Sequence, residues 1–220
     1  SLLTGEYYCE RIAALTRSAT DELFNLADKV TANDEYTAGK IFESLLKTGI
    51  GMSFSQNSRP ASGSEHIISH LIECVQLRDG ILPNFHGEDI GVCTLEMLKY
   101  YNELAEHKTI KTKKENVDWD DVYKFYGSMA DNVKKLNFPH NVVDDVDKDV
   151  LRERWGDIVN IIHSVPDYNS VKEAMVKAHC KITVDDIGKD KTLFDNCVKY
   201  SPYMRHRLTL LRLKDMIVTE

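Results

Sequence analysis

The sequence predicts an all-α fold, and two observations support this prediction. Apolar residues recur at intervals of three and four along most of the chain, which is the spacing of one face of a helix. No segment shows a convincing alternation of apolar and polar residues, the pattern of a half-buried strand. The composition, with 42% hydrophobic and 29% charged residues, is typical of a globular protein rather than a disordered one. We therefore expect residues 1–220 to form a single helical domain.

Two long amphipathic helices are expected first. Apolar residues between Glu6 and Val30 recur at helical spacing, and a polar break precedes the second helix. That helix is expected to begin with Asp34 as its cap and to run to about Gly49. The apolar Ile50, Met52 and Phe54 indicate the alternative that the helix resumes beyond its glycines or packs onward. Its predicted buried face consists of Ala38, Ile41, Phe42, Leu45 and Leu46.

A third helix follows a loop at residues 53–63 that is rich in Ser, Asn, Gly and Pro. Ser62 or Ser64 is expected to cap this helix. It ends at Asp79-Gly80, and a fourth helix begins at Phe85-His86. The apolar stripe of the third helix is predicted to consist of Ile67, Ile68, Leu71, Ile72 and Val75.

Shorter helices are predicted in the second half of the chain. They lie near residues 118–129, after the acidic residues 144–149 as far as His163, and at residues 167–180. Two closing helices then flank Ser201-Pro202. The last of them is expected to place Leu208, Leu211 and Met216 inward. Its other face would be a solvated basic surface, or would pair with acidic residues of another domain, through Arg205, Arg207, Arg212 and Lys214.

Charge, hydropathy and cysteine usage exclude several classes of protein. A net charge of −7 argues against nucleic acid as a partner, because phosphates would be repelled. No apolar run approaches the roughly 20 residues that cross a bilayer, so no membrane partner is expected. The first residues show neither an initiating Met nor a signal-peptide pattern, as in a domain cut from a longer chain. The five widely spaced cysteines are interpreted as buried thiols in a cytoplasmic protein.

Three histidines suggest a metal or substrate site. His66 and His70 are four residues apart, so they share one helix face beside the apolar stripe, not within it. His86 opens the next helix, where the helix dipole disfavours the imidazolium form and so favours the neutral ring that a metal requires. The alternative is coincidence, because eight histidines in 220 residues produce some close pairs by chance.

These residues resemble a known family. The run Ser58-Arg-Pro-Ala-Ser-Gly-Ser-Glu-His66, the following His70, and His86-Gly-Glu-Asp-Ile-Gly-Val92 closely resemble the metal-binding half of sn-glycerol-1-phosphate dehydrogenases. These enzymes belong to the wider superfamily of glycerol dehydrogenases and iron-containing alcohol dehydrogenases. Residues 3–13 resemble the first helix after the family's domain junction, and residues 203–213 resemble its closing helix.

The resemblance implies a dehydroquinate synthase-like two-domain dehydrogenase. Family members bind a divalent metal, usually zinc, with nickel or iron as alternatives, through one Asp and two His. His66 and His86 match the two histidines. The family's Asp and its nucleotide-binding domain lie upstream of the residues present here, and no G-x-G-x-x-G motif occurs in this chain. The chain is therefore expected to be the carboxy-terminal domain alone, with NAD(H) or NADP(H) bound mainly by the absent domain.

The implied reaction interconverts dihydroxyacetone phosphate and sn-glycerol 1-phosphate, so the partner is a small phosphorylated triose or glycerol. His70 would orient a substrate hydroxyl or relay a proton. Arg59 would bind the substrate phosphate, or else form a salt bridge, and Ser62 would contact the substrate or cap its helix. A homo-oligomer is compatible with the sequence. Three alternatives remain at this point: a glycerol dehydrogenase acting on unphosphorylated polyols, a non-catalytic helical module that binds a partner, and one chain of a two-chain enzyme.

Overall fold

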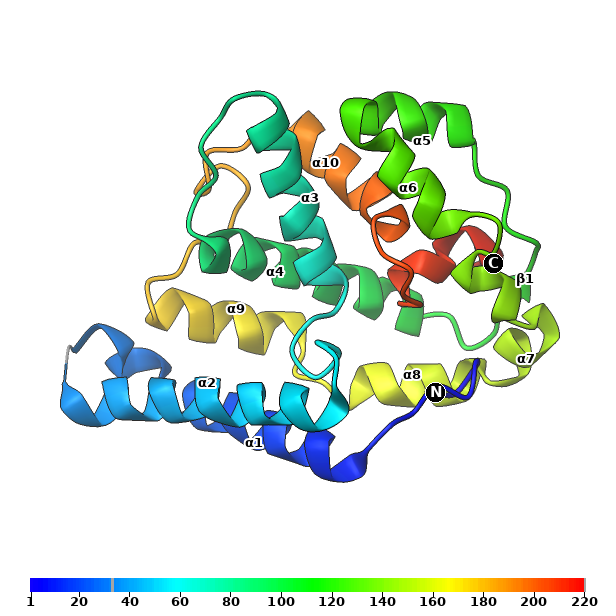
Figure 1. The fold of residues 1–220 in the computed structure, drawn as a ribbon. Coiled ribbons are helices and arrows are strands. Elements are labelled where there is room, and N and C mark those ends of the chain that lie inside the picture. The colour runs from blue at the N-terminus through cyan, green and yellow to red at the C-terminus, as the bar shows by residue number, and fades with distance from the viewer. Residues whose placement is uncertain (33, 220) are drawn as a thin grey trace.

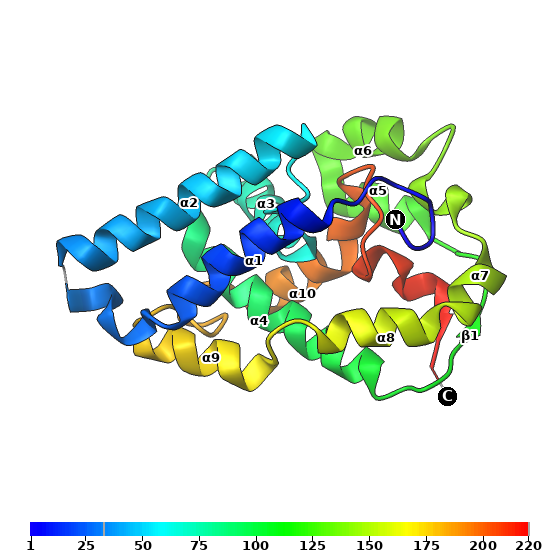
Figure 2. The ribbon, with the colours of Figure 1, turned by 90° about the horizontal axis from the view of Figure 1, so that it is seen from below.

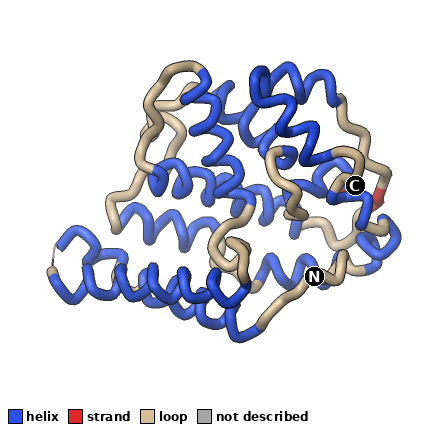
Figure 3. Tube along the Cα trace, in the orientation of Figure 1, coloured by secondary structure: helices blue, strands red, loops and turns tan. Residues whose placement is uncertain are grey.

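The computed structural model describes residues 1–32 and 34–219, and it is built almost entirely from helices (Figures 1 and 3). The all-α prediction is confirmed. The α-helices are, in chain order, α1 (Glu10–Phe24), α2 (Glu35–Ser55), α3 (Ser64–Arg78), α4 (His86–Ala105), α5 (Trp119–Tyr126), α6 (Ala130–Asn137), α7 (Lys148–Glu153), α8 (Trp155–His163), α9 (Tyr168–Lys177) and α10 (Lys191–Tyr200).

Helix α4 lies at the centre of the molecule. It packs against α3, α8 and α9, while α3 also packs against α10 (Figure 1). The stripe predicted for α3 is confirmed, since Ile68, Leu71 and Ile72 are fully buried. Two apolar clusters result. One lies around α3, α5 and α10, and the other lies around the end of α4 with α7 and α8.

Helices α1 and α2 lie side by side as a hairpin along one edge of the molecule (Figures 1 and 2). The predicted cap Asp34 is confirmed, because its carboxylate accepts a hydrogen bond from the backbone N–H of Thr37. The predicted length of the first helix was wrong, and the second helix follows the alternative in which it resumes beyond Gly49. Helix α1 stops at Phe24 and continues as a 3₁₀ helix at Ala27–Ala32, and α2 continues through its glycines to Ser55.

The predicted buried face of α2 was also wrong. Phe42, Leu45 and Leu46 are 62%, 66% and 50% exposed, and the residues that α2 buries are Thr37, Ser44 and Gly51. The physical reason is the close approach of α1. A Cβ atom on Gly51 would lie only 3.4 Å from the side chains of Ile12 and Thr16, so the hairpin is closed by small residues. Periodicity locates an apolar face but not the partner that covers it.

The closing helix predicted over residues 203–213 is absent from the described chain. After α10, the segment forms short 3₁₀ helices at Ser201–Tyr203 and Leu211–Met216. Arg212 was expected on a solvated face but is 1% exposed, where it pairs with Glu115 and donates to Asn141 Oδ1 at 2.9 Å. Burial lowers the pKa of Arg212 to about 10. Side-chain contacts to separate parts of the molecule therefore hold this segment away from a regular helix.

The chain end forms a small sheet that the sequence did not indicate. The two-residue strands β1 (Lys111–Thr112) and β2 (Ile217–Val218) pair antiparallel, with Lys111 opposite Val218. The expectation of five buried thiols was correct only for Cys93 and Cys197, since Cys9 and Cys74 are partly exposed and Cys180 is exposed. Among the described residues, no helix is both long and apolar enough to cross a membrane.

Candidate metal centre

The first histidine stands at the start of α3. The predicted Ser caps were wrong, because Gly63 occupies the N-cap position and no side chain caps the helix there. Instead, the Glu65 carboxylate accepts the backbone N–H of Gly63 at 2.7 Å. The same carboxylate oxygen lies 3.0 Å from Nδ1 of His66. Glu65 therefore fixes both the entry into α3 and one ring nitrogen of His66.

The third histidine is the first residue of α4, as predicted. The loop before it is anchored, because the Asn84 side chain donates to the carbonyl oxygen of Ile187 at 2.7 Å and to Asp89 at 3.3 Å. Asp89 is fully buried with its carboxylate 3.8 Å from the Lys189 ammonium. This buried ion pair ties the first turn of α4 to the loop before α10 and so determines where His86 stands.

The structure brings the three predicted histidines together. The ring centres of His66 and His86 are 5.7 Å apart, those of His70 and His86 are 4.9 Å apart, and those of His66 and His70 are 6.4 Å apart. His86 is thus the residue nearest to both others. His86 is 16 to 20 residues away from the other two in the sequence, and the packing of α3 against α4 brings it next to them.

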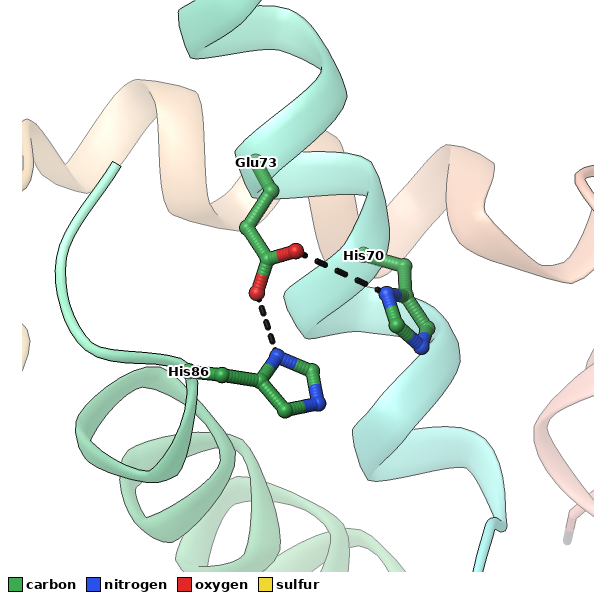
Figure 4. A group of neighbouring side chains, drawn as sticks. All are labelled: His70, Glu73 and His86. Carbon is green, nitrogen blue, oxygen red and sulfur yellow. Dashed lines mark hydrogen bonds and ion pairs between the residues drawn. The ribbon is translucent and has the colours of Figure 1, made fainter. Parts of the chain in front are cut away.

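A carboxylate that the sequence analysis missed completes the cluster. One Glu73 oxygen accepts a hydrogen bond from Nδ1 of His86, and the other lies 3.6 Å from Nδ1 of His70 (Figure 4). Glu73 also accepts a hydrogen bond from Ser69 at 3.3 Å. A signal for it was available, since Glu73 is three residues after His70 and so shares its helix face.

The donor set fits a divalent metal. Ligand atoms of His70, Glu73 and His86 all lie within 4.8 Å of one another. Two imidazoles on one tetrahedral zinc, at a Zn–N distance of about 2.0–2.1 Å, place their ring centres about 5 Å apart, which both His86 pairs approach. Imidazole and carboxylate are ligands that zinc, nickel and iron accept. Burial lowers the pKa of His70, against the opposing charge of Glu73, and this favours the neutral ring.

A cavity of about 290 Å³ adjoins the histidines. Its walls include Ser62, His66, His70, Arg205 and Arg207. Two of the three predicted substrate residues, Ser62 and His70, therefore line one space.

Arg59, the third predicted substrate residue, lies elsewhere. Its guanidinium pairs with Glu6 and borders a different cavity, beside the first residues of the chain. The salt-bridge alternative describes this conformation, and a role for Arg59 in phosphate binding stays a prediction.

Comparison with known proteins places the chain beside one group of enzymes. No family model matches it. It is 38% identical over 98 residues to glycerol-1-phosphate dehydrogenase (NAD(P)+) of Methanosarcina acetivorans, which is 44% of this chain and 26% of the relative. The protein of the same name from Thermococcus sibiricus is 32% identical over 112 residues, 51% of this chain and 31% of the relative.

A third relative covers nearly the whole chain. Glycerol-1-phosphate dehydrogenase (NAD(P)+) of Halalkalibacterium halodurans is 24% identical over 96% of this chain and 46% of its own length. The chain spans between about a quarter and a half of the curated relatives it matches. The chain is thus a relative of the glycerol-1-phosphate dehydrogenases, and its helical fold is the one expected of their carboxy-terminal domain.

Proposed function

We propose that this chain is the metal- and substrate-binding half of a metal-dependent NAD(P) dehydrogenase that interconverts dihydroxyacetone phosphate and sn-glycerol 1-phosphate. One observation carries the proposal. His66 and His86 lie with ring centres 5.7 Å apart, and each has Nδ1 engaged by a carboxylate, Glu65 for His66 and Glu73 for His86.

Each carboxylate contact has a chemical consequence. A hydrogen bond at Nδ1 selects the tautomer whose Nε2 lone pair is available to a metal, and outer carboxylates of this kind orient metal-binding histidines. His66 and His86 would therefore hold the metal through Nε2. A metal bound there, zinc by first choice, supplies a Lewis acid that stabilises negative charge on the oxygen of a ketone or alcohol.

His70 has a different setting. It lines the cavity, its ring centre is 4.9 Å from that of His86, and its Nδ1 lies 3.6 Å from Glu73. We assign it the orientation of the substrate hydroxyl, or the transfer of a proton at that oxygen through Nε2. The Glu73 carboxylate would then serve both His86 and His70, orienting one ring and stabilising positive charge on the other.

The nicotinamide cofactor is assigned to residues outside this chain. The relatives bear NAD(P)+ in their names, and the chain spans at most about half of their length. We propose that a dinucleotide-binding domain joins this one in the complete enzyme, so the 220 residues alone would be inactive. The cytoplasmic location and a homo-oligomeric state stay predictions.

A partner-binding helical module is the second candidate. It is favoured by the exposed apolar side chains of α2, including Phe42 and Leu45. The two candidates differ in what a metal does. An enzyme needs it for turnover, whereas a module of this kind needs it, at most, for structure.

The ligand assignment is tested by titrating zinc into the chain by calorimetry. We expect weak binding that H66A and H86A abolish, and that H70A retains. E65Q and E73Q should each lower the zinc affinity about 10- to 100-fold, as loss of an outer carboxylate does. The exposed His163 on α8 provides the control variant H163A, which should bind zinc as the parent chain does.

The reverse pattern would change the ligand set. If H70A abolished zinc binding while H66A preserved it, the ligands would be His70, Glu73 and His86.

The reaction is tested on the polypeptide as its source organism makes it, loaded with zinc and supplied with NADH or NADPH. We expect turnover of dihydroxyacetone phosphate to sn-glycerol 1-phosphate. Faster turnover of unphosphorylated dihydroxyacetone would indicate a glycerol dehydrogenase, and no metal-dependent turnover of either ketone would favour the module.

A further inference from the structure

The cavity beside His66 and His70 is lined by positive charge, which is unusual in an acidic protein. The chain as a whole carries a net charge of −7, yet two arginines, Arg205 and Arg207, line this space together. Both come from the irregular segment that follows α10. Like charges held next to each other repel, and a bound anion is the usual compensation.

Arg207 has a structural task. Its guanidinium donates to the carbonyl oxygen of Ser62 at 2.6 Å and to the hydroxyl of Ser58 at 2.9 Å. These two hydrogen bonds fasten the loop before α3 to the carboxy-terminal segment. Burial lowers the pKa of Arg207, with further contributions from Arg59 and Arg205. Arg207 therefore forms the wall of the cavity and adds positive charge to it.

Arg205 has no such task. Its guanidinium makes no hydrogen bond or ion pair with any residue in the described ranges 1–32 and 34–219, and the side chain is exposed. The other arginines compared with it are engaged: Arg59 pairs with Glu6, and Arg212 with Glu115. Arg205 nevertheless lines the same cavity as His66 and His70. Arg205 is thus an exposed cation on the wall of the cavity, without an ion-pair partner among the residues that the structure describes.

Size and chemistry agree on the ligand class. A volume of about 290 Å³ is at the lower end of the range for ligand pockets, which suits a molecule of a few carbons. A guanidinium offers paired N–H donors that match the oxygens of a phosphate. Ser62 also lines the cavity, and its hydroxyl is a neutral donor. His66 and His70 border the same space, so a ligand held by its phosphate would present its carbons to them.

We propose that Arg205 binds the phosphate group of the substrate, a phosphate monoester dianion, with Arg207 and the Ser62 loop as the fixed wall of this subsite. Arg205 thereby takes the role that the sequence analysis considered for Arg59. The inference rests on the proposed function for the identity of the phosphate ester, but the anion site itself does not require turnover. Arg205 would then be the residue that makes the enzyme prefer the phosphorylated ketone to the unphosphorylated one.

The first arm of the test measures binding without catalysis. Inorganic phosphate is titrated into the metal-free chain by calorimetry, with chelator present so that no metal recruits the anion. R205Q should weaken phosphate binding about tenfold or more, the usual range for a charge-assisted hydrogen bond. R17Q removes the same charge from an exposed position on α1 and should leave binding unchanged. Equal weakening in both variants, or no phosphate binding by the parent chain at tens of millimolar, would overturn the proposal.

The second arm uses the complete, metal-loaded polypeptide. R205Q should raise KM for dihydroxyacetone phosphate about tenfold or more, while kcat/KM for dihydroxyacetone stays within about twofold. An increase in KM for NADPH without one for the ketone would assign Arg205 to a cofactor phosphate and overturn the proposal. If the parent enzyme reduced neither ketone, the proposed function would fail, and the phosphate titration would still decide the anion site.

Discussion

The α3–α4 pair and the α1–α2 hairpin both contain helices with large apolar side chains, but α3 and α2 place those side chains in opposite ways. Helix α3 buries its large residues, such as Ile68 and Leu71, and leaves imidazoles at the rim. Helix α2 buries Ser44 and Gly51 and leaves Phe42 and Leu45 exposed. The difference teaches that an apolar stripe stabilises a helix only where a neighbour covers it. The centre of the molecule is held by apolar packing, and the hairpin is held by close backbone approach and charge.

The largest expected difference between the two regions is in core truncation. Leu71→Ala removes a fully buried side chain from the cluster around α3, and it should lower the free energy of unfolding by about 2–5 kcal/mol. Leu45→Ala removes a side chain that is 66% exposed and should change it by no more than about 0.5 kcal/mol. Urea denaturation of both variants measures this. A comparable loss in Leu45→Ala would mean that the exposed face of α2 is covered in solution.

A second, smaller effect concerns how the hairpin closes. Gly51→Val places methyl groups against Ile12 and Thr16, so it should force α1 and α2 apart at a cost of about 1–3 kcal/mol. Gly49→Val is the matched control, because it makes the same change in the same helix where nothing lies within 4 Å of the new Cβ. Thermal unfolding of the pair isolates the packing effect from helix propensity. Equal stability of the two variants would contradict close packing at Gly51.

The smallest expected effect is the pH dependence of the hairpin. Lys40 and Lys47 each pair with both Glu22 and Glu43. Hydrogen bonds from Lys47 and then Lys40 lower the pKa of Glu43 to about 2, from an ordinary value of 4.5. Because the folded-state pKa is the lower one, this contribution to stability is present above pH 4.5 and is lost as the pH falls towards 2.

Hydrogen exchange of the α2 amides between these pH values measures that loss. The α2 amides should lose protection on acidification relative to those of α3, and E43Q should reduce the difference. High salt should also reduce it, because these side chains are partly exposed and screened. A pH response that persists in E43Q would show that another group causes it.

Local sequence signals were sufficient where the physics is local. The breaks and periodicities of α3 and α4 predicted both helices, the buried stripe from Ile67 to Val75, and His86 at the first position of α4. The i, i+4 spacing placed His66 and His70 on one face, and the motif resemblance identified the relatives before any geometry was considered. These features depend on residues a few positions apart, so the sequence alone determines them.

Tertiary structure decided everything that joins distant segments. The crossing of α3 and α4 brought His86 to His66 and turned Glu73 from an unremarked helix residue into the carboxylate between two imidazoles. Contacts of Arg207 and Arg212 across more than 90 residues replaced a predicted helix with an irregular segment and left Arg205 beside the site. Such placements arise from the packing of the whole chain. The periodicity within one segment does not show which distant residues will form hydrogen bonds with its side chains.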